Sequence, residues 1–113
     1  MQDRILLVED EPALQSLLAR YLARLGYEVT SCATRAEATP HAGEPFRAAI
    51  IDLSLPDGPG EELAARLQDS RPELRVLLTS GYPAKTSGAN TAFLQKPFLP
   101  AALAEALTAL LRA

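Results

Sequence analysis

The sequence predicts an α/β domain built on a doubly wound, five-stranded parallel sheet with the strand order 2-1-3-4-5. Five short apolar segments alternate with segments of helical periodicity, which is typical of parallel strands joined by right-handed crossovers. Residues 5–8 and 48–51 are continuously apolar, as expected of strands buried on both faces. Polar residues follow these segments directly, at the edge where open α/β sheets bind ligands, and five such strands most often take this order.

The predicted strands and helices alternate along the whole chain. We expect strands over residues 5–8, 27–32, 46–51, 74–78 and 91–94. The first helix is the clearest, because apolar side chains recur at the spacing of one helix face between Pro12, which suits a first turn, and Gly26, which suits the end. We expect further helices over residues 35–39 and 61–69 and from Pro100 onward, with a tight turn over 56–60.

Composition limits the classes of protein to consider. The chain has 113 residues, 48% hydrophobic and 22% charged, so we expect one domain over residues 1–113. The formal net charge is −3 and no run of Lys or Arg occurs, which argues against direct binding to nucleic acid. No apolar segment approaches the roughly 20 residues of a membrane span, and we recognise no signal peptide. A single cysteine, Cys32, suits a reducing compartment, so we expect a cytoplasmic protein without a membrane partner.

Four polar residues are expected to meet in one crevice at the carboxyl edge of the sheet. The first and third strands are neighbours in the predicted order, so Asp10 and Asp52 would lie close together. Ser80 and Lys96 would reach the same place from the fourth and fifth strands. The turn Glu9-Asp10-Glu11-Pro12 attracts a cation, unlike the glycine-rich turn of a nucleotide site. We therefore interpret Asp52 as a phosphoryl acceptor whose magnesium ion is held by the other acids.

Four motifs, each at the end of a predicted strand, together resemble a known family. They are Leu6-Leu7-Val8-Glu9-Asp10-Glu11, Ile51-Asp52-Leu53-Ser54-Leu55-Pro56-Asp57-Gly58, Leu78-Thr79-Ser80-Gly81 and Gln95-Lys96-Pro97-Phe98. Each is weak alone, but in this order the chain resembles, over its whole length, the receiver domain of two-component response regulators. This is the phosphoacceptor domain of the chemotaxis-regulator-like superfamily. The flavodoxin-like strand order is also that of the family, so the two predictions are not independent.

The resemblance implies a phosphoacceptor and a set of metal ligands. Asp52 matches the aspartate that is phosphorylated, and Asp10 matches the main acidic ligand of Mg²⁺. Glu9 matches the neighbouring acid, which acts directly or through water. The backbone carbonyl of Ser54 matches a further ligand, and Glu11 receives no ligand role.

The resemblance also implies a switch and its partners. Ser80 matches the hydroxyl residue that moves onto the phosphoryl group, and Lys96 matches the lysine that pairs with it, before a proline usually joined by a cis bond. Phe93 matches the aromatic residue whose rotamer follows the switch, although aromatic side chains are more often core fillers. The implied partners are a histidine kinase or histidine phosphotransfer protein, and a downstream protein target or covalently linked domains. We also consider a homodimer.

Two features depart from the family pattern. Residues 82–90 alone join the fourth and fifth strands, although a helical crossover needs roughly 10–12 residues or more. Several residues there are poor helix formers, so we expect a shortened or missing fourth helix beside an under-covered part of the sheet. The second departure is Glu9, which stands where aspartate is common and retains the charge.

Three functions of different classes compete. The leading hypothesis is a receiver that switches a protein-interaction surface in a phosphorelay, with self-catalysed phosphoryl chemistry at most rather than conventional enzyme activity. The alternative is an interaction module of the same fold that does not use phosphorylation, as the short crossover would favour. The third hypothesis is an enzyme or cofactor binder, but the chain lacks the glycine-rich turn that nucleotide binding would need. A magnesium-dependent phosphatase is a variant of this hypothesis, and it would need an acid or base where Ser54 stands. We expect His41 to be an exposed loop residue and Cys32 a buried small hydrophobe.

Overall fold

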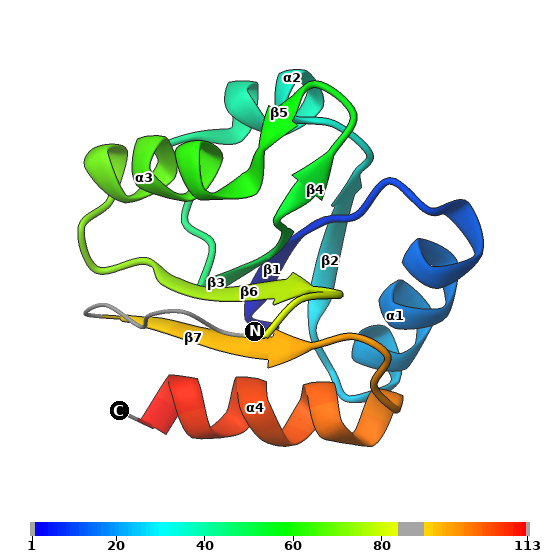
Figure 1. The fold of residues 1–113 in the computed structure, drawn as a ribbon. Helices are drawn as coiled ribbons and strands as arrows, with labels where there is room; N and C mark the ends of the chain where they lie inside the picture. The colour runs from blue at the N-terminus through cyan, green and yellow to red at the C-terminus, as the bar shows by residue number, and fades with distance from the viewer. Residues whose placement is uncertain (1, 84–89, 113) are drawn as a thin grey trace.

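A computed structural model of the chain describes residues 2–83 and 90–112. Its centre is a parallel five-stranded sheet with the order β2-β1-β3-β6-β7 (Figure 1), which confirms the predicted fold class and strand order. The strands are β1 (Arg4–Val8), β2 (Glu28–Cys32), β3 (Ala48–Asp52), β6 (Arg75–Ser80) and β7 (Thr91–Gln95). All five predicted strands therefore form, with ends that shift by a residue or two.

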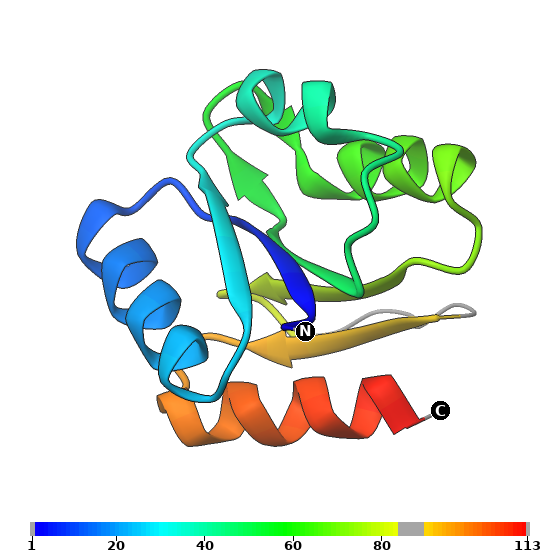
Figure 2. The same ribbon diagram turned by 180° about the vertical axis from the view of Figure 1, so that it is seen from behind.

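Helices cover both faces of the sheet. They are α1 (Pro12–Arg24), α2 (Arg35–Ala38), α3 (Gly60–Ser70) and α4 (Pro100–Arg112), with a 3-10 turn over Thr39–His41 after α2. Helices α1 and α4 lie on one face, and α2 and α3 lie on the other, as both views in Figures 1 and 2 show. Among the described residues, none of the helices is long and apolar enough to cross a membrane.

The core is divided into two layers by the sheet. Leu6 and Val8 of β1 pack with buried residues of α2 and α3, whereas Ile5 and Leu7 pack with buried residues of α1 and α4. Because successive strand residues point to opposite faces, a strand covered on both sides must be apolar throughout. This explains why the central strands show no polar alternation.

Helix α1 has the predicted ends, and Glu11, to which no ligand role was assigned, lies at its N-terminus. The Glu11 carboxylate accepts hydrogen bonds from the backbone N–H groups of Ala13 (3.3 Å) and Leu14 (2.6 Å), so it caps the helix. Gly26 has a φ of 100°, the left-handed conformation that favours glycine after a helix. The capping contact leaves the Glu11 side chain engaged with α1.

The connection between β3 and α3 contains a small hairpin in place of the simple turn that we predicted. Strands β4 (Ser54–Leu55) and β5 (Gly58–Pro59) pair in an antiparallel manner, with Pro56 and Asp57 at the tip. Two-residue strands carry no periodicity in the sequence, so only the turn residues were recognisable. The hairpin places Gly60 at the start of α3, one residue earlier than predicted.

The connection between β6 and β7 is described only at its two ends. Residues 81–83 and residue 90 contain no helix, and residues 84–89, where the shortened crossover was predicted, lie outside the described residues. Tyr82 is 74% exposed at the beginning of this connection. Helix α4 is the last of the four helices found among residues 2–83 and 90–112.

Candidate functional site

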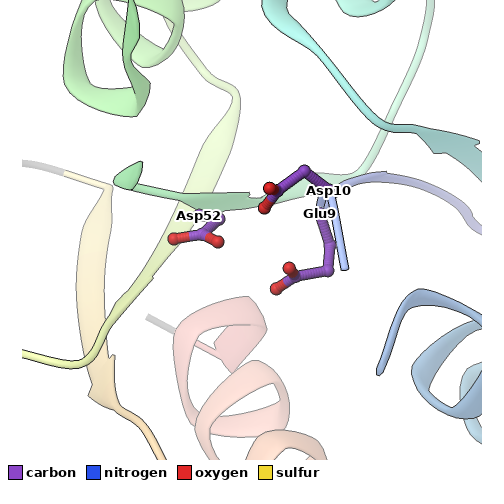
Figure 3. Close-up of side chains that lie close together, drawn as sticks. All are labelled: Glu9, Asp10 and Asp52. Atoms are coloured by element: carbon purple, nitrogen blue, oxygen red, sulfur yellow. The ribbon is translucent and has the colours of Figure 1, made fainter. Parts of the chain in front are cut away.

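Three carboxylates meet at the carboxyl edge of the sheet. Strands β1 and β3 are neighbours, with Val8 opposite Ile51, so the residues that follow these strands lie side by side. One carboxylate oxygen from each of Glu9, Asp10 and Asp52 lies within 4.8 Å of the others. Figure 3 shows the three side chains gathered around one point. The acidic pocket that the sequence predicted is thus formed by these three residues.

The acidic pocket is partly closed to solvent. Glu9 is 2% exposed and Asp52 is 5% exposed, whereas Asp10 is more accessible. Burial raises the pKa of the Glu9 carboxyl, and the nearby Asp52 charge raises it further, against the opposing effect of hydrogen bonds from Lys96 and the Glu11 backbone. Like charges held this close in a buried place are typical of functional sites rather than of stabilising contacts.

Lys96 supplies a positive charge to the acidic pocket. Its Nζ lies 2.8 Å from Glu9 Oε1 and 3.0 Å from Asp52 Oδ2, donating a hydrogen bond to each. Although burial lowers the pKa of Lys96, these two hydrogen bonds raise it above its usual value. The Lys96–Pro97 peptide bond is cis, as the resemblance implied.

The residues after Asp52 are tightly arranged around it. Asp52 Oδ1 accepts a hydrogen bond from the Ser54 backbone N–H (3.0 Å). A Cβ atom on Gly60 would lie 2.2 Å from the Asp52 carbonyl oxygen, so only glycine fits there. Ser54 is paired with Pro59, which has no N–H group and cannot donate to the Ser54 carbonyl. The carbonyl predicted as a metal ligand therefore receives no hydrogen bond from its strand partner.

Ser80 ends β6, one position after the Thr79 that lies opposite Asp52, whereas Phe93 is in the middle of β7. Ser80 is buried, and its Oγ accepts a hydrogen bond from the Tyr82 backbone N–H (3.1 Å). Phe93 is half-buried opposite Leu78, and neither layer of the core, within the described part of the chain, includes it. Lys96 thus bonds to Glu9 and Asp52, with Asp10 beside them, and its backbone N–H also donates to the Ser80 carbonyl oxygen (2.7 Å), whereas no bond of the Ser80 hydroxyl or of Phe93 to these residues is found in the described part of the chain.

Gln15 supports the acidic pocket and was missed from the sequence. Its Nε2 donates to the carbonyl oxygens of Glu9 (2.9 Å) and Cys32 (3.0 Å), tying α1 to the ends of β1 and β2. In the sequence, the only sign of this role was the position of Gln15 shortly after the acids. The Cys32 carbonyl is distant in the chain and is brought to Gln15 only by the fold. Gln15 therefore fixes the backbone from which Glu9 and Asp10 project.

The residues of the acidic pocket fit a divalent cation. Hard cations such as Mg²⁺ and Ca²⁺ bind carboxylate and carbonyl oxygens, and this pocket offers three carboxylates. A triad of this kind is typical of the metal site of receiver domains. Opposite charge would also relieve the repulsion among the three side chains.

The fold and the acidic pocket together define a class of protein: a flavodoxin-like domain with a carboxylate cluster and a lysine at the carboxyl edge of its sheet. Residues 5–108 match the family described as response regulator receiver domain, and the chain belongs to this family. Receiver domains are phosphoacceptor modules rather than conventional enzymes, and they pair with histidine kinases.

Individual relatives agree with this assignment. The chain is 31% identical over 102 residues to the response regulator receiver protein CpdR of Brucella abortus, covering 84% of this chain and 85% of CpdR. A receiver domain structure from Methanospirillum hungatei superposes with a TM-score of 0.88 at 29% identity, covering 99% of this chain and 95% of that one. The chain spans less than half the length of other curated relatives, among them transcriptional regulators and a sensor protein.

One related structure contains a modified aspartate. It is a response regulator from Burkholderia pseudomallei with a phosphorylated aspartic acid, a calcium ion and citrate. Its sequence is 30% identical and its TM-score is 0.78, covering 94% of this chain and 66% of that one.

Proposed function

We propose that Asp52 accepts a phosphoryl group from a histidine kinase or histidine phosphotransfer protein, and that the modified domain presents an altered surface to a downstream target or linked domain. The observation that carries this proposal is the cluster of Glu9, Asp10 and Asp52 with Lys96 bonded to Asp52. The phosphorylated relative supports the same chemistry. Mg²⁺ is the cation we propose, held by the three carboxylates and the Ser54 carbonyl.

The reaction needs positioning more than covalent assistance. An Asp52 oxygen attacks the phosphorus of a phosphohistidine, the P–N bond breaks, and the departing imidazole takes up a proton. Mg²⁺, when bound, neutralises charge on the phosphoryl oxygens. Lys96 is already at Asp52, where its ammonium group can pair with the same oxygens.

Formation of the acyl phosphate gives the switch its driving force. The phosphoryl group carries a charge of about −1.5 to −2. Because the Asp52 carboxylate loses its own charge when the bond forms, the site gains about −0.5 to −1 in total, beside the remaining carboxylates of Glu9 and Asp10. Lys96 would exchange its bond with Glu9 for one with the phosphoryl group. Ser80 would exchange its bond with the Tyr82 backbone in the same way, which moves the connection that begins at Gly81. We propose that Phe93, which is outside both layers of the core, changes rotamer with that movement.

The experiment that tests this proposal is intact mass measurement after incubation with acetyl phosphate and Mg²⁺. We expect one phosphoryl group on the wild type, none on Asp52→Asn, and a full yield on Asp69→Asn, a matched change at an exposed position of α3. A chelator should abolish the modification of the wild type. Equal modification of Asp52→Asn would contradict the assignment, and a wild type with neither modification nor Mg²⁺ binding would leave the unphosphorylated interaction module.

A further inference from the structure

The tip of the β4–β5 hairpin is fastened to the beginning of α2. Asp57 Oδ1 accepts a hydrogen bond from the Arg35 backbone N–H and Asp57 Oδ2 accepts one from the Ala36 backbone N–H, each at 2.9 Å. These backbone hydrogen bonds, that of Arg35 first, lower the pKa of the Asp57 carboxyl, so Asp57 is ionised at neutral pH. One side chain thus satisfies two N–H groups of a helix that lies more than 20 positions earlier in the chain.

The Arg35 side chain holds the same hairpin from the other direction. Its Nη1 donates to the Asp57 carbonyl oxygen (3.2 Å), and its Nη2 lies 3.3 Å from Glu62 Oε1 on α3. A Cβ atom on Gly58 would lie 1.8 Å from Arg35 Nη1, so the guanidinium occupies space that only glycine leaves open. We call these contacts of Asp57 and Arg35 the hairpin clasp.

The opposite end of the hairpin is the phosphoacceptor. Asp52 bonds to the Ser54 backbone N–H, and the Leu53 carbonyl oxygen accepts from the Gly60 N–H (3.0 Å). Between these points the chain makes only the two pairs Ser54–Pro59 and Leu55–Gly58. A two-stranded hairpin this short is marginal by itself, so its orientation depends on what holds its ends.

We propose that Asp57 is a positioning residue for the cation site: the hairpin clasp holds the hairpin so that the Ser54 carbonyl and the Asp52 carboxylate face Glu9 and Asp10. This inference rests on the proposed function, because it concerns the geometry of the same site. Asp57 touches neither the cation nor the phosphoryl group. Its loss should therefore weaken cation binding and slow phosphorylation without preventing either.

The matched control lies on the same helix. Thr34 also caps α2, because its Oγ1 accepts a hydrogen bond from the Glu37 N–H (3.0 Å), but it does not contact the hairpin through that bond. Thr34→Ala should destabilise α2 much as Asp57→Ala does, since each removes a side-chain cap. The two variants therefore separate a loss of stability from a loss of positioning.

The test is calorimetric titration of the whole chain with Mg²⁺, together with the rate of phosphorylation by acetyl phosphate. We expect Asp57→Ala to raise the dissociation constant for Mg²⁺ about tenfold, at the low end of the effect of residues that orient metal ligands. Asp57→Asn retains one acceptor oxygen and should give an intermediate value. Thr34→Ala should bind Mg²⁺ like the wild type even though its unfolding midpoint falls.

Two results would overturn the inference. Either Asp57→Ala and Asp57→Asn bind Mg²⁺ as the wild type does, or Thr34→Ala weakens binding to the same degree, which would reduce Asp57 to a structural cap. If Asp57→Ala fails to fold, Asp57→Asn and Thr34→Ala carry the same comparison. A wild type that binds no Mg²⁺ and gains no phosphoryl group would instead refute the proposed function itself.

Discussion

The two edges of the sheet use charge in opposite ways. At the carboxyl edge, three carboxylates lie together, and Lys96 pairs with two of them, Glu9 and Asp52. At the amino edge, a group of residues that we call the amino-edge cluster pairs each acid with a base: Arg4 lies 2.8 Å from Glu44, His41 lies 2.8 Å from Glu44, and Arg4 lies 3.2 Å from Glu28. The Arg4 guanidinium also lies 4.5 Å from the centre of the Phe46 ring.

This difference separates a functional site from a stabilising one. Balanced charges at the amino edge hold the starts of β1, β2 and the segment before β3 together, and nothing there calls for a ligand. The excess of negative charge at the carboxyl edge opposes folding, and the cation that we propose to bind there would reduce this cost. The domain therefore keeps an unfavourable arrangement at the edge where we propose that it reacts.

The largest expected effect comes from adding a Cβ atom to one glycine at each edge of the sheet. Gly60→Ala places a Cβ 2.2 Å from the Asp52 carbonyl oxygen, and relief of that clash must move the Asp52 backbone. We expect the free energy of unfolding to fall by about 3 kcal/mol, together with weaker Mg²⁺ binding. Gly43→Ala, near the amino edge, meets no atom within 4 Å and suffers only from its φ of 89°, so a loss of about 1 kcal/mol is expected. Urea unfolding measures the loss of stability in both variants. Equal losses of stability, together with equal Mg²⁺ affinity, would contradict the account.

The next largest effect is expected from removal of the shared lysine. Lys96→Met removes the ammonium group that pairs with Glu9 and Asp52. In the absence of Mg²⁺, the free energy of unfolding should therefore fall by about 2 kcal/mol. Saturating Mg²⁺ should recover most of this loss, because it takes the place of the missing charge. Arg47→Met removes an exposed pair with Asp3 near the amino edge and should cost at most about 1 kcal/mol, independent of Mg²⁺. Loss of stability in Lys96→Met that Mg²⁺ does not reverse would weaken the comparison.

The smallest expected effect is on the free energy of unfolding when one acid at each edge is replaced by its neutral amide. The two replacements should change it in opposite directions. Glu9→Gln removes a buried carboxylate whose pKa is raised, so at pH 7 the variant should be more stable than the wild type by about 0.5 kcal/mol. Glu44→Gln removes a carboxylate whose pKa is lowered by the hydrogen bonds from Arg4 and His41, so at pH 7 it should be less stable than the wild type. Urea unfolding of both variants at several pH values measures the effect.

Acidification should erase both differences. The unfavourable contribution of ionised Glu9 is present above its raised folded pKa and disappears as pH falls below the ordinary value of 4.5. The favourable contribution of Glu44 is present above that ordinary value of 4.5 and disappears as pH falls through its lowered folded pKa. Effects of the same sign for both variants at pH 7 would show that the two edges do not differ in the proposed way.

The elements of the fold could be predicted wherever one residue pattern decided them. The continuously apolar Ala48–Ile51 indicates a strand buried on both faces, and the leucines of α1 recur at the spacing of one helix face. The acidic pocket followed from topology alone, since residues that end neighbouring parallel strands must meet. That reasoning placed Asp10 and Asp52 together without any knowledge of side-chain contacts.

What the sequence did not predict depends on partners that are distant in the chain. His41 was expected to be an exposed loop residue, which is wrong: it is half-buried, with Nδ1 against Glu44 and its ring edge against Phe46. Asp57 was recognisable only as a turn residue, because its role depends on the N–H groups of α2. The sequence placed Lys96 at the same crevice but could not show that its Nζ bridges Glu9 and Asp52.

The central claim, that the carboxyl edge exists to form an acyl phosphate on Asp52, is tested most directly by chemical trapping. The wild type is incubated with acetyl phosphate and Mg²⁺, reduced with borohydride, digested, and sequenced by mass spectrometry. Borohydride reduces an acyl phosphate to an alcohol, so our account predicts homoserine at position 52 and at no other aspartate. A phosphoryl group that survives reduction on Ser54 or Ser80, with Asp52 unchanged, would contradict it.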